Sequence, residues 1–150
     1  MSFIIPEITM KVSFDKKLKK SELVKINESK QVWELLVNIF NKDTFDWCEE
    51  FIVLYLNNSN KVVGYFKLSS GGMTSTVVDV RMIYAVGLKC MATCVIVAHN
   101  HPSGKITPSD ADKQITKKIK EAGEFMDIKL LNHIIVTDEN YFSFQDEGLL

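Results

Sequence analysis

The sequence predicts an α/β fold in which helices flank a mixed β-sheet. Short apolar runs typical of buried strands occur at residues 51–56, 93–98 and 130–137. Segments with apolar residues at helical spacing lie before and between these runs. Because the connections include both tight turns and a helical crossover, we expect parallel and antiparallel strand pairs in one sheet.

Size and composition limit the class of protein. A chain of 150 residues with 46% hydrophobic and 25% charged residues is long enough to bury the core of one compact domain. The formal net charge of -1 lacks the excess of Lys and Arg that is typical of nucleic-acid-binding proteins. The 3 cysteines, an odd number, and a start without a signal-peptide pattern favour the cytoplasm. No apolar run approaches the roughly 20 residues of a membrane span, so we expect no membrane partner.

The first part of the chain, residues 1–48, is expected to form an N-terminal arm and a helix that packs on the main domain at 49–150. Residues 8–14 alternate weakly between apolar and polar types, as in an edge strand or a partner-binding arm. From Ser29 to Phe40 the apolar residues recur at helical spacing. Ser29 suits the N-cap of that helix.

A β-hairpin is expected next. Glu49 and Glu50 directly precede the apolar run 51–56, which predicts a strand buried on both faces. Polar residues at 57–60 predict a turn, and residues 61–68 then form the returning strand.

The middle of the chain predicts a β-α-β order. The Ser and Gly residues at 69–72 tolerate a positive φ and break the sheet. Residues 74–80 are rich in β-forming types, residues 81–91 have helical spacing, and residues 93–98 form a buried strand.

The last part predicts a helix and two strands. Thr107 suits the N-cap of a helix that starts at Pro108 and runs to residue 122 or 126. Residues 130–137 predict a strand, and residues 141–144 predict a short returning strand.

Polar side chains concentrate directly after the predicted strand 93–98, where active sites are commonly found. In an extended segment His99 and His101 project from the same side, at a separation that one metal ion can bridge. Asn100 points away from them. The sequence therefore predicts a metal site at the end of this strand.

The following helix supplies a third ligand. Pro and Gly residues turn the chain, so that the first turn of the helix brings Ser109 and Asp112 back towards the histidines. Two histidines, one carboxylate and an open fourth position are typical of catalytic zinc, whereas structural sites use four protein ligands. A water molecule bound to zinc has its pKa lowered to about 7, and a nearby base is also needed to take and return protons. Glu49 and Glu50 are both candidates, because acidic residues at the start of a buried strand are costly without a function.

These residues fit a known pattern. The sequence resembles the JAMM (JAB/MPN) metalloprotease motif, a glutamate followed by H-x-H-x7-S-x2-D, at His99, His101, Ser109 and Asp112. The resemblance extends to the bacterial RadC-like branch. It covers residues 49–150 and includes His-Asn-His-Pro-Ser-Gly at 99–104, Ser-Gly-Gly at 70–72, Asn-His-Ile-Ile at 132–135 and Tyr-Phe-Ser at 141–143.

The resemblance implies a cytidine-deaminase-like α/β fold and a Zn²⁺-dependent hydrolase of the peptidase or isopeptidase kind. The expected partner is then a peptide or protein substrate. The resemblance assigns His99, His101 and Asp112 as the metal ligands. It assigns Glu49 as the base and Ser109 as the residue whose hydroxyl stabilises the oxyanion. Glu49 is selected over Glu50 as the base because the family's strand reads E-x-F-x-V-L. Stabilisation of the oxyanion by a hydroxyl such as that of Ser109 contributes a few kcal/mol.

The chain departs from the family's pattern outside the proposed ligands. RadC-like proteins often carry a helix-hairpin-helix DNA-binding module ahead of this domain, and residues 1–48 show no such pattern. The family's usual Asp before the late histidine is Asn132, and its usual Pro before Arg81 is Val80.

Other interpretations of the chain remain open. It is alternatively a DNA-associated repair or accessory protein with a structural or vestigial metal site, or a metal-dependent nuclease. Nothing in the sequence indicates an oligomeric state.

Single residues also have simpler interpretations. Ser109 and Asp112 suit helix capping, worth about 1 kcal/mol, although Thr107 is the expected cap. His133 is expected to be a hydrogen-bonded histidine of the core or its rim rather than a fourth ligand, and Cys90 and Cys94 to be core residues rather than ligands.

Overall fold

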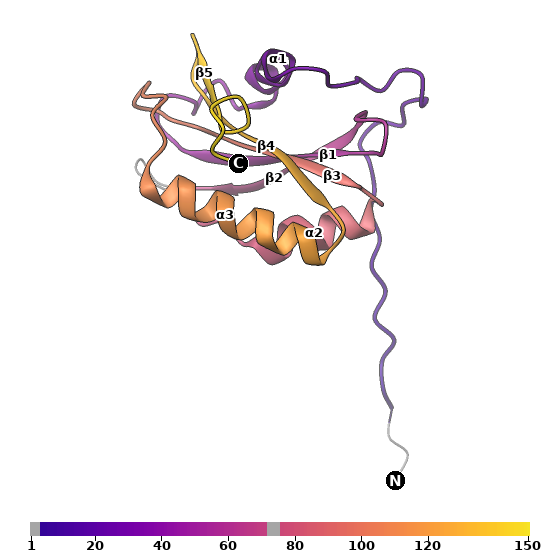
Figure 1. The fold of residues 1–150 in the computed structure, drawn as a ribbon. Helices are drawn as coiled ribbons and strands as arrows, with labels where there is room; N and C mark the ends of the chain where they lie inside the picture. The colour runs from indigo at the N-terminus through magenta and orange to yellow at the C-terminus, as the bar shows by residue number, and fades with distance from the viewer. Residues whose placement is uncertain (1–3, 72–75) are drawn as a thin grey trace.

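The computed structural model describes residues 4–71 and 76–150 (Figure 1). Along the chain, its elements are α1 (Ser29–Ile39), β1 (Glu50–Leu56), β2 (Val62–Ser70), α2 (Val80–Lys89), β3 (Cys94–Asn100), α3 (Asp110–Phe125), β4 (Lys129–Val136) and β5 (Tyr141–Ser143). The strands form one sheet in the order β2-β1-β3-β4-β5. The pair β3 and β4 is parallel and is connected by α3, and the other neighbouring pairs are antiparallel. The predicted α/β fold with a mixed sheet is confirmed.

The sheet lies between α1 on one face and α2 and α3 on the other (Figure 1), and an apolar layer packs on each side. β1 lies inside the sheet between β2 and β3, and all of its residues are buried. Because side chains alternate along a strand, its odd-numbered apolar residues pack with α2 and α3, and its even-numbered ones pack with α1. Helices therefore cover both faces, as the near-continuous apolar sequence of this strand predicts.

The prediction of a strand at residues 74–80 is wrong for residues 76–80, the part of this segment that the structure describes. Residues 76–79 form no strand, and Val80 is the first residue of α2. The carboxylate of Asp79 accepts a hydrogen bond of 3.0 Å from the amide of Arg81 and caps α2, which begins one residue before its predicted start. The β-branched residues before Asp79 produced the strand signal, but the β-α-β unit consists of β3, α3 and β4.

The Ser-Gly-Gly turn is described only in part. Ser70 ends β2, and the amide of Gly71 donates to the carbonyl oxygen of Glu49 over 2.9 Å. Gly72 lies outside the described residues. This backbone contact holds Glu49 beside the end of β2.

Two predicted N-caps are wrong. Glu28 precedes α1 and makes no capping bond with its side chain, whereas the hydroxyl of Ser29 donates to Asp146 over 2.9 Å and ties the helix to the C-terminal segment. The cap of α3 is Ser109 instead of Thr107. Both cap candidates have an aspartate three residues later, and the structure uses the pair whose aspartate is buried, Ser109 and Asp112.

The N-terminal arm, residues 4–24, runs outside the sheet. Its residues 8–14 form no strand, so the edge strand considered for them is wrong, and the apolar side chains of Ile4, Ile5 and Ile8 are exposed. The arm joins the body at an isolated antiparallel bridge between Lys25 and Lys61. Of the helices in residues 4–71 and 76–150, none combines the length and apolar character of a bilayer span.

Replacement of Gly123 by alanine should destabilise the fold by about 1–3 kcal/mol. A Cβ atom at this position in α3 would lie 2.4 Å from the carbonyl oxygen of Ile128 and 2.7 Å from the hydroxyl of Tyr84. That hydroxyl also donates to the carbonyl oxygen of Ile119, which restrains Tyr84, so the backbone at Ile128, directly before β4, must move as well. Urea denaturation measures the loss. Lys120→Ala, an exposed change on the same helix, should stay within about 0.5 kcal/mol of the unmodified protein, and equal stability of both variants would contradict this packing.

Candidate metal centre

The end of β3 presents the two histidines. β3 continues through His99 and Asn100, beyond its predicted end, and His101 follows the strand directly. His99 stacks on Phe51 of the neighbouring strand, with an interplanar angle of 6°. Asn100 turns to the other face, where its side chain accepts from the amide of Glu50 over 2.7 Å and donates to the carbonyl oxygen of Cys48 over 2.9 Å. The predicted opposite orientation of Asn100 is confirmed.

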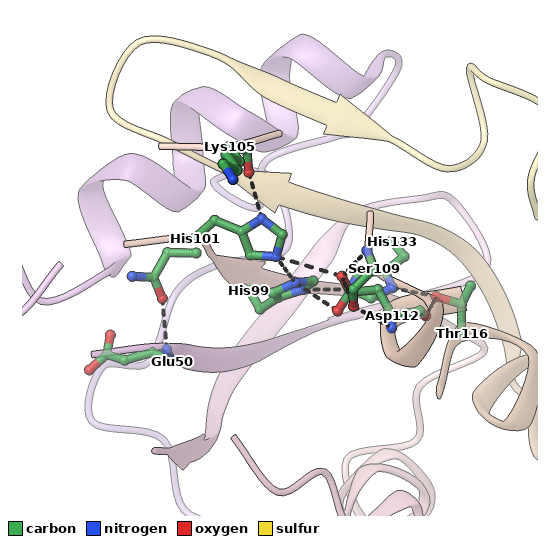
Figure 2. A network of polar contacts seen from close by, with 9 residues as sticks. Glu50, His99, His101, Lys105, Ser109, Asp112, Thr116 and His133 are labelled. Atoms are coloured by element: carbon green, nitrogen blue, oxygen red, sulfur yellow. Dashed lines mark hydrogen bonds and ion pairs between the residues drawn. The ribbon is translucent and has the colours of Figure 1, made fainter. Parts of the chain in front are cut away.

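Asp112 reaches the histidines from the first turn of α3 (Figure 2). The Nε2 atoms of His99 and His101 are 2.9 Å apart. The carboxylate oxygens of Asp112 lie 3.1 Å from Nε2 of His99 and 3.6 Å from Nε2 of His101. An ion with tetrahedral ligands at about 2.0–2.1 Å would separate those ligand atoms by roughly 3.3 Å. The group His99, His101 and Asp112 therefore fits a metal ion, and its candidate ligand atoms lie within 4.8 Å of one another.

The chemistry of the three groups also suits a cation. Nδ1 of His101 lies 2.5 Å from the carbonyl oxygen of Lys105, which can only accept a hydrogen bond. Nδ1 must therefore carry the proton, and in the neutral imidazole Nε2 offers a lone pair towards Asp112.

The charges within the site are coupled. Burial alone raises the pKa of Asp112, but the neighbouring imidazoles of His101 and His99 and the hydroxyl of Ser109 outweigh it and hold that pKa well below its usual range. Burial alone lowers the pKa of His101, but the carboxylate of Asp112 and the carbonyl oxygen of Lys105 outweigh it, so the pKa is raised. Without a metal, His101 therefore holds its second proton up to a higher pH than an ordinary histidine does.

Zinc binding should therefore weaken as the pH falls. The raised pKa of His101 means that its imidazole keeps a proton at higher pH than an ordinary histidine, and a metal must displace that proton. We expect the apparent zinc affinity to fall by up to about tenfold per pH unit below that pKa. Competition with a chelator of known affinity, from about pH 8 down to about pH 6, measures the slope. A flat profile after correction for the chelator would contradict the assignment of His101.

Ser109 and Asp112 also form a capping box at the start of α3. The amide and the hydroxyl of Ser109 both donate to Oδ2 of Asp112 over 2.7 Å, and the amide of Asp112 donates to the hydroxyl oxygen of Ser109 over 3.1 Å. Assigning this role to Thr107 was wrong. The two roles of Asp112 are compatible, because Oδ2 accepts from Ser109 while Oδ1 faces His99. Capping therefore positions the candidate ligand.

The two glutamates face opposite sides of β1. Glu49 lines a cleft of about 460 Å³ that also contains the three candidate ligands and Ser109. Burial raises the pKa of Glu49, and the nearby histidines only partly oppose that effect. Glu50 is turned away, where its carboxylate accepts from the amide of Asn41 over 3.2 Å and lies 3.8 Å from Nζ of Lys67. Of the pair, Glu49 is the one placed to act on a molecule in the cleft.

Further polar residues lie behind the ligands. His133 of β4 is fully buried and contacts Nδ1 of His99 over 2.8 Å, which agrees with the predicted hydrogen-bonded core histidine. Burial lowers the pKa of His133 well below its usual value, so the imidazole is neutral. Thr116 contacts His133 over 2.6 Å. Thr116 was not predicted from the sequence, although it lies four residues after Asp112, on the same face of α3.

The cysteines take no part in this centre. Cys90 packs against the apolar layer on the side of α2 and α3, and Cys94 packs against the layer on the side of α1. The sheet separates the two thiols, so they do not share a metal ion.

Comparison with known proteins identifies the family. The RadC-like JAB domain family matches residues 26–149, which include α1 and the whole sheet. The chain belongs to the RadC-like JAB domain family. This RadC-like JAB domain therefore has the predicted JAB/MPN fold, with a candidate metal site at the position of the motif.

Several curated relatives of this RadC-like JAB domain carry the name UPF0758 protein. The one from Flavobacterium johnsoniae is 51% identical over 128 residues, which are 85% of this chain and 55% of the relative. The one from Porphyromonas gingivalis is 44% identical over 103 residues, which are 68% of this chain and 45% of the relative. The one from Chlorobaculum parvum is 39% identical over 102 residues, or 68% and 46% of the two chains. The chain spans about half the length of these curated relatives.

Proposed function

We propose that this RadC-like JAB domain is a zinc-dependent hydrolase that cleaves the amide bond of a peptide or isopeptide. The observation that carries the proposal is the convergence of His99, His101 and Asp112 in the cleft that Glu49 also lines. Two histidines and one carboxylate leave a fourth position for water or substrate, as catalytic zinc sites do. The three free cysteines, none in a disulfide, favour a reducing cytoplasm as the place of this activity.

His99, His101 and Asp112 would hold the ion. When bound, zinc supplies a Lewis acid that polarises the scissile carbonyl and acidifies water. Glu49 takes the proton from the attacking water and delivers it to the leaving amine nitrogen. Its raised pKa suits both transfers, because a carboxyl group that ionises closer to neutrality gives the proton back more readily.

Ser109 is the proposed donor to the oxyanion. Its hydroxyl lines the cleft, and in the metal-free site it donates to Asp112 over 2.7 Å. Rotation of this hydroxyl towards the carbonyl oxygen would leave the amide of Ser109 still bonded to Asp112, also over 2.7 Å. The ligand therefore stays in place while the hydroxyl changes partner.

The substrate is proposed to lie along the apolar wall of the cleft, which includes Phe51, Val78 and Ile115. The apolar lining of the cleft suits the side chains of a peptide better than a phosphodiester backbone. The net charge of -1 also weighs against nucleic-acid binding. A peptide or protein is therefore the favoured partner.

Parallel substrate tests distinguish this proposal from the alternatives. Zinc-loaded protein is incubated in ¹⁸O-water with a peptide library that contains linear and lysine-linked isopeptide bonds, and separately with single-stranded and double-stranded DNA. We expect new peptide carboxyl groups that carry ¹⁸O, and their loss when zinc is removed by a chelator. Cleavage of DNA alone would replace the proposal by a nuclease. Bound zinc without cleavage of either substrate would favour the accessory protein.

A further inference from the structure

We propose that His133, held by Thr116, is a positioning residue that fixes the tautomer of His99 and so selects the ring nitrogen offered to the metal. This inference rests on the proposed function, because it concerns the same site. It adds two residues that the motif does not contain. Figure 2 shows the chain of contacts from Asp112 through Thr116 and His133 to His99.

A continuous chain of hydrogen bonds links two of the candidate ligands, Asp112 and His99. Thr116 lies one helical turn after Asp112, and its hydroxyl donates to the carbonyl oxygen of Asp112 over 2.5 Å. The same hydroxyl oxygen is 2.6 Å from Nδ1 of His133. On the other side of the ring, Nε2 of His133 is 2.8 Å from Nδ1 of His99. The path links the ligand of α3 to the ligand of β3 through the neighbouring strand β4.

The direction of each hydrogen bond follows from the first. A carbonyl oxygen only accepts, so the single hydroxyl proton of Thr116 is used on Asp112. Thr116 must then accept from Nδ1 of His133, which leaves a lone pair on Nε2 of that neutral ring. This lone pair accepts the proton on Nδ1 of His99. Nε2 of His99 is left unprotonated, 3.1 Å from Asp112 and 2.9 Å from Nε2 of His101.

The surroundings keep this path in one arrangement. The exposed fractions of His133, His99 and Thr116 are 0%, 1% and 2%, so water does not compete for these bonds. The ring of Phe144 stacks on His133 with its centroid 4.8 Å away, and the ring of Phe51 stacks on His99. The imidazole planes therefore have little room to rotate. His101 receives the equivalent orientation from the carbonyl oxygen of Lys105.

Two substitutions of Thr116 test the inference. Thr116→Val keeps the shape of the side chain and removes the hydroxyl, whereas Thr116→Ser keeps the hydroxyl. Imidazole ¹⁵N shifts report the tautomer of His99 in metal-free protein, measured at a pH high enough that the shifts no longer change with pH. We expect a proton on Nδ1 in the unmodified protein and in Thr116→Ser, and a mixture of tautomers in Thr116→Val. The affinity for zinc should fall by about 10–100-fold in Thr116→Val alone.

A tautomer and a zinc affinity that stay unchanged in folded Thr116→Val would overturn the inference. If Thr116→Val does not fold, His133→Gln tests the same step. The amide oxygen of glutamine can accept from His99, so this variant should keep the proton on Nδ1, and a shift to Nε2 would overturn the assignment. If the unmodified protein binds no zinc, the proposed function fails, while the metal-free spectra still test the path.

Discussion

Replacing Glu49 by glutamine should slow peptide hydrolysis by the zinc-loaded protein by about 10²–10⁴-fold, the usual contribution of a positioned general base. The amide of glutamine fills the same space but cannot take a proton from water. Bound zinc should stay at the level of the unmodified protein, because Glu49 is outside the group of candidate ligands. Initial rates, measured with metal content by elemental analysis on the same samples, separate the two effects.

The neighbouring glutamate provides a matched control. Glu50→Gln changes the same chemical group one residue away, on the opposite face of β1 beside Asn41. It should keep full activity. The activity of the unmodified protein should rise with pH through the raised pKa of Glu49, because only the ionised carboxylate accepts a proton. Full activity in Glu49→Gln, or an equal loss in both variants, would exclude Glu49 as the base.

His101→Ala should weaken zinc binding by more than about 100-fold. Loss of a partner behind a ligand already costs about 10–100-fold in affinity, and loss of the ligand costs more. His101 is the cleanest ligand to remove, because it is absent from the path through His133 and from the capping box of α3. Isothermal titration with zinc measures the affinity, and a thermal scan without metal verifies that the variant is folded.

Lys105→Ala is the control for this change. His101 contacts the backbone carbonyl of Lys105, which alanine retains, so zinc affinity should be unchanged. If His101→Ala binds zinc as tightly as the unmodified protein, the site on β3 and α3 is not the zinc site. Loss of affinity in both variants would indicate that the loop as a whole, and not the imidazole, is responsible.

Structural features that depend on residues close in sequence could be predicted well. The two histidines share a side because a strand has a period of two, and β1 was recognisable because both of its faces are apolar. Local signals failed where two solutions were equally good. Thr107 and Ser109 each precede an aspartate by three residues, and only packing against the histidines selects Ser109. The β-branched residues 76–78 suggest a strand, but the cap of α2 follows immediately.

Features that depend on several elements could not be read from spacing. Spacing alone did not decide whether Glu49 or Glu50 is the candidate base. That choice depends on which face of β1 meets α2 and α3. The path from Thr116 to His99 joins α3, β4 and β3, whose contacts arise only when the sheet forms. The pattern of the RadC-like family was therefore the stronger guide to the candidate ligands, and the geometry was needed to find the residues behind them.

The capping box makes the start of α3 and the candidate metal centre a single mechanical unit. Asp112 can leave the histidines only if its bonds to Ser109 break or the first turn of the helix unwinds with it. Capture of an ion by Asp112 would in turn clamp that turn. Local unfolding of this first turn would therefore carry Asp112 away from His99 and His101, so that loss of one helical turn would also remove one candidate ligand.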